Sequence, residues 1–371
     1  MSGAAPALAR LWVGNLDCEV EWAGGPPLPA AVVTRLALLA TTLRAFCAPE
    51  DGGGDAAGDA GDARRDGEDA LWLPAPVAAG ALAGPGPRPR LVAGAVPAAI
   101  RTRAWGASAR VGSPAEVAVA RAVNDRRFAA ALAADRGVAL PGACVITSVD
   151  ALAAHLAAGG AGASPTGTWV AKAALTAAGR DRVRRRGDAL DPPTATRLAR
   201  LLAVHGALVF EPWMARTLDV GQGGEVGAGG AIALHPPHRG LVDDAGVVRG
   251  IVIDEGAALE PGERALLAAT ARAAGLALAA AGYRGPFVID GFVHERDGRR
   301  QLHPMCELNA RLTFGLVARA WAARLGTPLT LGLGGAPPPG AHALVHDQDG
   351  TAAAWVLPTP TRAQDRGKSP R

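Results

Sequence analysis

Residues 287–315 read FVIDGFVHERDGRRQLHPMCELNARLTFG, and this stretch decides the fold. Its first part, residues 287–293, is apolar and β-prone with one carboxylate, Asp290, set into it. A second apolar run follows and carries Glu307. The residues between the two runs, 296–300 (RDGRR), are a turn signal. The two runs are therefore predicted to pair as an antiparallel hairpin.

The hairpin gathers acidic and amide side chains. If residues 297–300 form a four-residue loop, Asp290 lies opposite Glu307 on the neighbouring strand. Asn309 comes two residues after Glu307, so in an extended chain it points to the same face. Carboxylate and amide oxygens are hard ligands that suit Mg²⁺ bound jointly with a polyphosphate. Arg311, two residues further on, is expected to face the phosphates as a planar fork of donors.

A plainer interpretation is that Asp290 and Glu307 are solvated charges on an edge strand, since carboxylates are usually exposed. Both acids, however, lie inside apolar runs, where burying an unpaired charge is costly. Their position therefore favours a paired or metal-binding role.

The hairpin resembles the C-terminal metal-binding hairpin of the ATP-grasp superfamily. The resemblance rests on Asp290, on Glu307-Leu308-Asn309-Ala310-Arg311, and on Gly282-Tyr283-Arg284-Gly285 upstream. The longer string LHPMCELNARLTFG is similar to a bacterial subgroup of that superfamily that carries a pre-ATP-grasp domain. The resemblance implies ATP as a cofactor, with Mg²⁺ or Mn²⁺ held by Asp290, Glu307 and Asn309.

Earlier parts of the chain follow the order of the same superfamily. Ser113-Pro114-Ala115-Glu116 is a capping-box helix start, and a second helix begins near Arg126. The resemblance places Arg126 at the nucleotide phosphates, although a surface salt bridge is an equal alternative. Lys172 ends an apolar strand, where a lysine can hold the α- and β-phosphates as a point charge. Arg180 lies in the basic loop that follows and is expected to help close over the nucleotide.

Residues 208–214 (LVFEPWM) are an apolar strand interrupted by Glu-Pro, a pattern suited to exposing backbone groups in a linker. This stretch resembles the superfamily's hinge. The resemblance implies that Glu211, Trp213 and Met214 receive the adenine and that Asp219 meets the ribose hydroxyls. Proline removes only its own N–H, so the Met214 amide and the Glu211 carbonyl remain available.

The following strand series contains weaker candidates for contacts to substrate or phosphate, namely Arg216, His235 and His238. Lone histidines beside prolines are more often structural or exposed than functional.

The fold class that follows is α+β, with two α+β lobes that sandwich the nucleotide behind a small α/β domain. A chain of 371 residues is long enough for two or three lobes. The predicted parts are a pre-ATP-grasp domain (1–110) with a disordered acidic insert (50–69), an N-terminal lobe (111–207), a C-terminal lobe (208–326), and closing strands with a basic tail (327–371).

Composition limits the classes of partner. The net charge of +4 and the pI of about 9.2 suit nucleic acid or an anionic nucleotide equally, and no nucleic-acid motif is present, so no nucleic-acid partner is expected. The four cysteines are scattered without CxxC spacing, which predicts neither a zinc site nor a disulfide framework. The N-terminal sequence lacks a signal pattern and no apolar run reaches membrane-spanning length, so we expect a cytoplasmic protein with no membrane association.

The chemistry implied by the resemblance is activation of a carboxylate by ATP to an acyl phosphate, followed by attack of an amine or thiol. Lys172 and Arg311 are the expected catalytic residues, because both would stabilise charge on the transferring phosphoryl group. The partners are small-molecule carboxylate and amine substrates, and a homodimer is left open. A phosphotransferase on the same scaffold and a non-catalytic nucleotide-binding protein are the alternatives.

Overall fold

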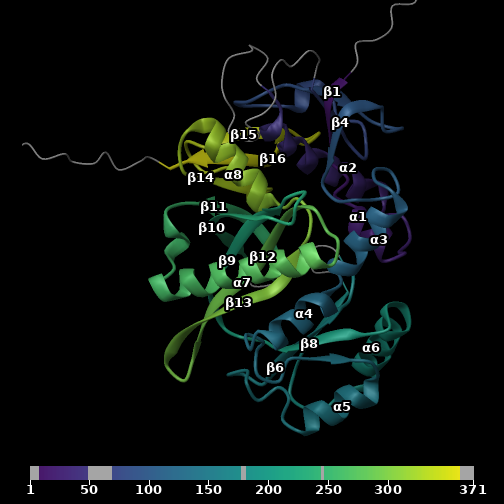
Figure 1. Cartoon of the computed structure of the whole chain (residues 1–371), viewed down its shortest axis with the longest axis vertical. Coiled ribbons are helices and arrows are strands. Elements are labelled where there is room, and N and C mark those ends of the chain that lie inside the picture. Colours follow the sequence, from purple (N-terminus) through teal and green to yellow (C-terminus); the bar gives the residue numbers. More distant parts are fainter. Residues whose placement is uncertain (1–7, 49–68, 177–180, 244–245, 360–371) are drawn as a thin grey trace, which may run out of the picture.

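Three sheets organise the computed structural model, which describes residues 8–48, 69–176, 181–243 and 246–359. The N-terminal domain and the last strands lie at one end of an elongated molecule, a large sheet lies in the middle, and a small lobe lies at the other end (Figure 1). The predicted acidic insert (except Asp69), Arg180 and the basic tail after residue 359 lie outside the described residues. Within the described part, no helix is both long enough and apolar enough to cross a bilayer.

The N-terminal domain is a parallel four-stranded sheet in the order β3-β2-β1-β4. Its elements are β1 (Leu8–Val13), α1 (Cys18–Trp22), α2 (Ala30–Ala40), η1 (Thr41–Phe46), β2 (Asp69–Trp72), η2 (Ala79–Ala81), β3 (Arg90–Val92) and β4 (Ala99–Ala104). Neighbouring strands lie on both sides of β1, so the loops after β1 and β4 meet at a topological switch point, where ligands of open parallel sheets bind. The loop after β4 reaches the large sheet through the hydrogen bond from the Leu312 amide to the Trp105 carbonyl.

The small lobe is an antiparallel sheet in the order β5-β8-β6-β7. Two helices lead into it, and Ser113 and Glu116 form the predicted capping box on the first of them. The elements are α3 (Pro114–Val123), α4 (Arg126–Asp135), β5 (Cys144–Ile146), α5 (Val149–Ala157), β6 (Thr168–Ala173), β7 (Arg182–Arg186), α6 (Pro192–His205) and β8 (Leu208–Pro212).

The large sheet has the order β13-β12-β9-β10-β11-β14-β16-β15. Its strands are β9 (Arg216–Val226), β10 (Ile232–Val242), β11 (Val248–Ile253), β12 (Gly285–Arg296), β13 (Arg299–Asn309), β14 (Leu329–Leu333), β15 (His342–His346) and β16 (Ala352–Pro358), and its helices are η3 (Gly256–Ala258), α7 (Pro261–Ala280) and α8 (Phe314–Leu325). The predicted closing strand pair is confirmed as β15 and β16, which extend this sheet. The domain boundaries drawn from the sequence stay a prediction.

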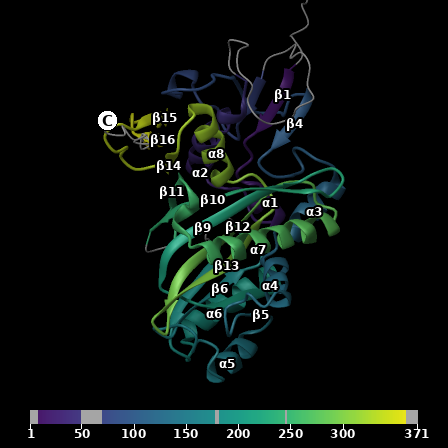
Figure 2. The ribbon, with the colours of Figure 1, turned by 60° about the vertical axis from the view of Figure 1, so that its left-hand side comes forward.

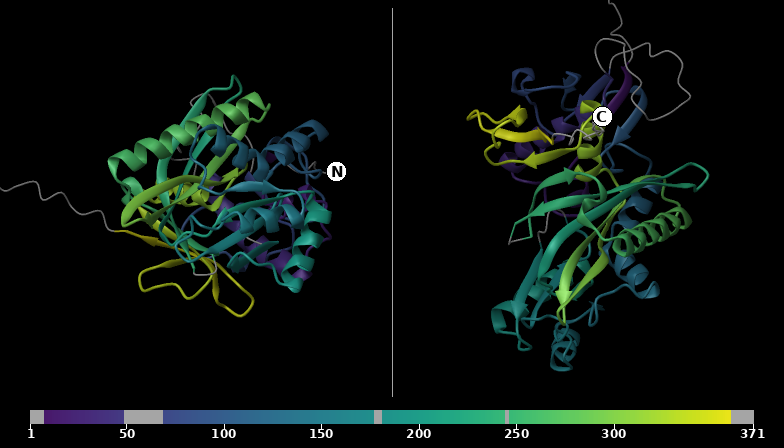
Figure 3. Two further views of the ribbon diagram at one scale, coloured as in Figure 1. Left: turned by 90° about the horizontal axis from the view of Figure 1, so that it is seen from below. Right: turned by 90° about the vertical axis from the view of Figure 1, so that its left-hand side faces the viewer.

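Side chains on the two faces of β12 pack in different hydrophobic clusters. Phe287 and Ile289 pack with α7, whereas Val288 packs with α8 and the N-terminal domain. Because strand side chains alternate, Asp290 shares the face of Val288. Figure 2 shows α7 along one face of the large sheet, and Figure 3 shows the small lobe beyond the sheet's lower part. The carboxylate of Asp290 thus belongs to the face on which Val288 packs with α8.

The loop of the β12–β13 hairpin differs from the prediction. Arg296 pairs with Arg299, so the connection is the two-residue turn Asp297-Gly298, with φ of 53° and 68°, and the predicted four-residue loop is wrong. Asp-Gly adopts the positive φ that a type I′ turn requires, which explains the tight connection. Asp290 still lies opposite Glu307, as predicted, because the register shifts between Asp290 and Phe292.

Gly291 makes that shift possible. Phe292 pairs with His303, so the residues 304–306 of β13 bulge opposite Gly291 alone. A Cβ at Gly291 would lie 2.6 Å from the carbonyl oxygen of His303 and 2.8 Å from that of Pro304. Backbone atoms cannot yield as a flexible side chain can, so this position requires glycine.

Gly291→Ala is therefore expected to lower the free energy of unfolding by about 1–3 kcal/mol, because the methyl group overpacks the bulge. Gly229→Ala is the matched control: nothing lies within 4 Å of its Cβ position, and its effect should stay within about 0.5 kcal/mol. Chemical denaturation measures both. Equal stability of the two variants would contradict the role of the bulge.

Candidate functional site

The three predicted metal ligands come together on adjacent strands. Asp290 on β12 pairs directly with Glu307 on β13. The amide nitrogen of Asn309 donates a hydrogen bond of 2.8 Å to Asp290 Oδ2. The side chain of Glu307 keeps 36% of its surface exposed, so the cluster is accessible from solvent at this residue.

The two carboxyl groups differ in their electrostatic environment. Burial and the nearby charge of Glu307 raise the pKa of Asp290 to about 7. Burial also raises the pKa of Glu307, but the charges of Arg126 and Lys172 outweigh it, so the pKa of Glu307 is lowered overall. At neutral pH Glu307 is therefore ionised, whereas Asp290 beside it resists ionisation.

This donor set fits a hard divalent cation. Among the described residues there is no group of three or more His, Cys, Asp or Glu side chains that could hold a metal ion. Two carboxylates and one amide oxygen match Mg²⁺, which usually takes only one or two protein carboxylates and fills its remaining positions with water and phosphate oxygens. The assignment of these residues as ligands remains a prediction.

Arg126 connects this cluster to the small lobe. It starts α4, and its Nη2 donates to Glu307 Oε1 at 2.8 Å. Its Nη1 donates to the Ala173 carbonyl at 2.7 Å and to Thr176 Oγ1 at 2.8 Å. Only 10% of the side chain is exposed, so the ion pair with Glu307 is not the surface salt bridge considered from the sequence. The expected phosphate contact stays a prediction.

Lys172 lies on β6 opposite the cluster. Its Nζ is 2.5 Å from Glu211 Oε2, and the two side chains are 15% and 12% exposed. The charge of Lys172 lowers the pKa of Glu307, so it acts across the space between the small lobe and β13. The predicted phosphate lysine and the predicted hinge glutamate are thus neighbours that neutralise each other.

Trp213 and Met214, in the predicted hinge, have different environments. The backbone N–H of Trp213 donates to the Thr168 carbonyl, and its carbonyl accepts from Ser164 Oγ at 2.8 Å. The N–H of Trp213 is therefore occupied, and its indole ring and the second lone pair of its carbonyl remain for an adenine contact. Met214 is buried in an apolar cluster with Leu140 and Phe292.

A ladder of alternating cations and rings crosses from the small lobe to the large sheet. The guanidiniums of Arg184 and Arg216 lie 4.7 Å and 5.3 Å from the Trp213 ring. Arg216 also lies 4.2 Å from the Phe292 ring. Each such contact adds roughly 0.5–2 kcal/mol, the larger value applying where the cation is desolvated. The sequence marked Arg216 only as a weak candidate, because its contact with the Phe292 ring depends on the pairing of β9 with β12.

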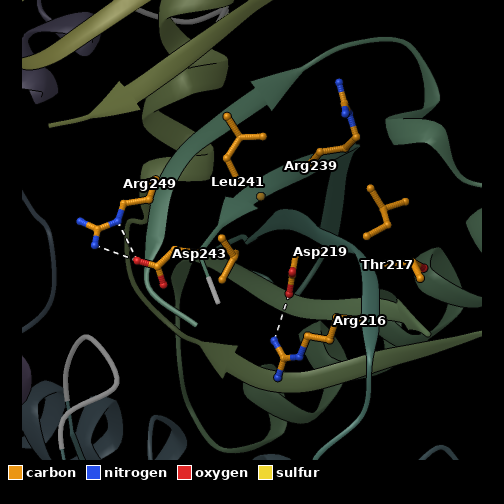
Figure 4. Close-up of a pocket in the computed structure, with 10 residues that line it drawn as sticks. Arg216, Thr217, Asp219, Arg239, Leu241, Asp243 and Arg249 are labelled. Carbon is orange, nitrogen blue, oxygen red and sulfur yellow. Dashed lines mark hydrogen bonds and ion pairs between the residues drawn. The ribbon is translucent and has the colours of Figure 1, made fainter. Parts of the chain in front are cut away.

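Asp219, the residue expected to meet the ribose, forms an ion pair with Arg216. Its Oδ1 accepts from Arg216 Nη1 at 3.0 Å, and Figure 4 shows the two side chains pointing toward each other. Both line a surface cavity of about 390 Å³ together with Arg239, Asp243 and Arg249. The ribose assignment of Asp219 stays a prediction, with Arg216 as a competing partner.

Arg311 is largely occupied within the described structure. Its Nε and Nη2 donate to Glu19 Oε1, its Nη1 to the Leu312 carbonyl, and its Nη2 also to Asn309 Oδ1. Four hydrogen bonds leave at most one of the five N–H donors for a phosphate. Sequence reasoning missed Glu19, since nothing local marks a residue whose partner lies 292 positions away.

The two weak histidine candidates lie on β10. His238 is only 5% exposed, and burial and the charge of Arg319 lower its pKa to about 3. A Cβ at Gly221 would lie 2.6 Å from His238 Nε2 and 3.1 Å from Asp290 Oδ1, so a neutral imidazole borders the cluster. His235 is less enclosed, and its carbonyl accepts from Gln222 Nε2 at 2.9 Å.

No protein-family model matches the chain, and no curated protein matches its sequence. Solved structures do match it. N5-carboxyaminoimidazole synthetase from Staphylococcus aureus, complexed with ADP, has a TM-score of 0.57 at 9% identity over 96% of this chain and 95% of that chain. N5-carboxyaminoimidazole ribonucleotide synthetase from Thermus thermophilus has a TM-score of 0.51 at 15% identity over 95% and 94%. The biotin carboxylase–β,γ-ATP complex from Campylobacter jejuni has a TM-score of 0.51 at 10% identity over 95% and 87%. At these identities the likeness is one of fold, and it extends over nearly the whole chain.

Asp290→Asn is expected to change how stability depends on pH in metal-free buffer. The pKa of Asp290 rises from the ordinary 3.8 to about 7 in the folded protein. The stability gained by protonating Asp290 is thus fully present below about pH 3.8 and is lost as the pH rises through about 7.

Between pH 5 and pH 8 the wild type should therefore lose free energy of unfolding relative to Asp290→Asn, by on the order of 1–2 kcal/mol because the carboxyl is only partly buried. Urea denaturation at fixed ionic strength measures the difference. A difference that stays constant across this range would contradict the raised pKa of Asp290.

Proposed function

We infer that this chain, which has the ATP-grasp fold, is an Mg-ATP-dependent ligase that activates a carboxylate and joins it to an amine. The observation that carries the proposal is the convergence of the Asp290, Glu307 and Asn309 cluster with Lys172 and Arg126 between two facing lobes. Solved structures of similar fold are complexes with ADP or β,γ-ATP, which supports a nucleotide as the ligand.

In this proposal the nucleotide lies between β6 and β13. The apolar cluster around Met214 and the Trp213 ring would receive the adenine, and Lys172 and Arg126 would bind the phosphates. Asp290, Glu307 and Asn309 would hold Mg²⁺, which neutralises negative charge on the transferring phosphoryl group. Lys172 must exchange its ion pair with Glu211 for the phosphates, and this exchange orients its ammonium toward the developing charge.

The reaction has two balanced steps. A carboxylate oxygen bonds to the γ-phosphorus while the bond from that phosphorus to the β–γ bridging oxygen breaks, which releases ADP. The amine nitrogen then bonds to the acyl carbon, the acyl–phosphate bond breaks, and phosphate and a proton leave. The loops at the switch point of β1 and β4 adjoin the cluster through Trp105 and Leu312, so the acceptor would enter from the N-terminal domain.

The first test is thermal stability with and without Mg-ATP. At about 100 times its dissociation constant the ligand should add about 2.7 kcal/mol to the wild type. Asp290→Asn and Glu307→Gln should lose this Mg²⁺-dependent gain. Glu225→Gln, on the same sheet but paired with Arg103 at an exposed position, should keep it. A wild type that gains nothing over a wide range of Mg-ATP would overturn the proposal.

The second test separates ligation from simple phosphoryl transfer. A screen of carboxylates and amines should find a pair for which ADP release requires both substrates and an amide appears in equal amount. ADP release with a phosphorylated acceptor and no amide would indicate a phosphotransferase instead.

Lys172→Met should lower kcat by about 10²–10³, because one preorganised charge at the phosphoryl group is lost. This variant leaves Glu211 unpaired, so Lys172→Met/Glu211→Gln serves as the companion that removes both charges. The control is Arg185→Met on β7, whose side chain binds Thr194 of α6. A companion variant with wild-type kcat would show that Lys172 has no part in the chemistry.

A further inference from the structure

A carboxylate of the N-terminal domain reaches the hairpin that carries the metal cluster. Glu19, on α1, accepts hydrogen bonds from Arg311 at 2.5 Å (Nη2) and 2.8 Å (Nε). Both side chains are only 13% exposed. A charge-assisted contact of this length between poorly solvated groups fixes both partners.

Arg311 is held at its other edges as well. Its Nη1 donates to the Leu312 carbonyl at 3.0 Å, and its guanidinium lies 5.7 Å from the Trp105 ring. The Leu312 amide donates to the Trp105 carbonyl at 2.8 Å. The N-terminal domain therefore holds this arginine through a carboxylate, an aromatic face and the neighbouring backbone.

The remaining Arg311 bond sets the orientation of Asn309. Arg311 Nη2 donates to Asn309 Oδ1 at 2.8 Å, and Asn309 Nδ2 donates to Asp290 Oδ2 at 2.8 Å. A guanidinium has only donors and a carboxylate only acceptors, so the amide has one satisfactory orientation between them. In that orientation the amide oxygen retains a second lone pair, and the NH₂ group pins the Asp290 carboxylate.

We propose that Glu19 is a positioning residue of the metal site: through Arg311 it fixes the Asn309 amide and the Asp290 carboxylate, so cation affinity depends on the docked N-terminal domain. The inference rests on the proposed function, because it takes the Asp290, Glu307 and Asn309 cluster as the cation site. Outer-shell partners of metal ligands are known to act in this way, and their loss typically costs 10–100-fold in metal affinity.

Two physical effects of losing the Glu19 charge act in the same direction. Without its strong acceptor, Arg311 is free to rotate and no longer selects one orientation of Asn309. The guanidinium charge also loses its counter-charge and then repels a cation bound beside it. An ion pair that only joined two domains would instead alter stability and leave cation affinity unchanged.

The experiment compares Glu19→Gln with Asp69→Asn. Asp69 is an acid of the same domain whose ion pair with Arg10, at 2.9 Å and 9% exposure of the acid, does not touch Arg311. Electron paramagnetic resonance measures Mn²⁺ binding to the protein–ADP complex, and calorimetry measures ADP affinity without metal. We expect Mn²⁺ affinity to fall about tenfold or more in Glu19→Gln and to stay within about twofold of wild type in Asp69→Asn. Metal-free ADP affinity should be the same in all three proteins.

A second comparison removes the relay itself. In an Asn309→Ala background, Glu19→Gln should cause a smaller further loss of Mn²⁺ affinity than in the wild type, because the orienting effect acts through Asn309 and only the repulsion by the unpaired guanidinium remains. If Glu19→Gln does not fold, Arg311→Lys replaces it, since an ammonium lacks the planar fork that reaches Glu19 and Asn309 together.

The outcomes separate this inference from the proposed function. A wild type that binds no Mn²⁺ with ADP would overturn the proposed function and the inference together. A wild type that binds Mn²⁺ normally, with Glu19→Gln no weaker than Asp69→Asn, would overturn the inference alone.

Discussion

The rest of the structure depends on two carboxylates held side by side across an antiparallel strand pair. Asp290 and Glu307 are direct cross-strand partners, and such side chains lie about 5 Å apart. Two like charges at that distance repel by about 3 kcal/mol at an effective dielectric constant of about 20. Burial, and after it this repulsion, raise the pKa of Asp290 to about 7. A fold that keeps this pair must supply positive charge, and it must do so from elements outside the hairpin.

Each nearby cation also has an acid of its own. Lys172 pairs with Glu211 and Arg216 pairs with Asp219. Arg311 pairs with Glu19. Arg126, the fourth cation, pairs with Glu307 of the cluster itself. These ion pairs offset much of the charge around the cluster without a ligand, which lowers the cost of burying the four cations. In a ligand that brings both phosphate and a divalent cation, the phosphate pairs with the protein's cations and the divalent cation pairs with the carboxylates. Phosphate or the divalent cation alone would leave one buried charge without a partner.

The sequence was sufficient for the hairpin and its acids because both depend on local alternation and turn chemistry. Even there, two deviations cancelled: the Asp297-Gly298 turn is shorter than predicted, and the bulge opposite Gly291 restores the pairing of Asp290. The α+β lobes behind a parallel α/β domain were also predictable from the order of motifs. No apolar alternation marks β4 in the sequence, because Arg101 and Arg103 break the pattern of a strand. The contacts of Arg126 and Arg311 span 181 and 292 positions, so they depend on how the domains pack and no local pattern encodes them.

On the β9 side, a glycine and a buried histidine border Asp290. Asp290 pairs with Gly221 of β9, and Gly221 pairs with His238 of β10. Since Gly221 has no side chain, the His238 ring fills the space above it and supports Gly315 at the start of α8. Burial and the charge of Arg319 keep that imidazole neutral, with a pKa of about 3, so it adds no positive charge on this side. The cations that lower the pKa of Glu307 therefore come from the small lobe, from α4 and from the loop after β13 that the N-terminal domain holds.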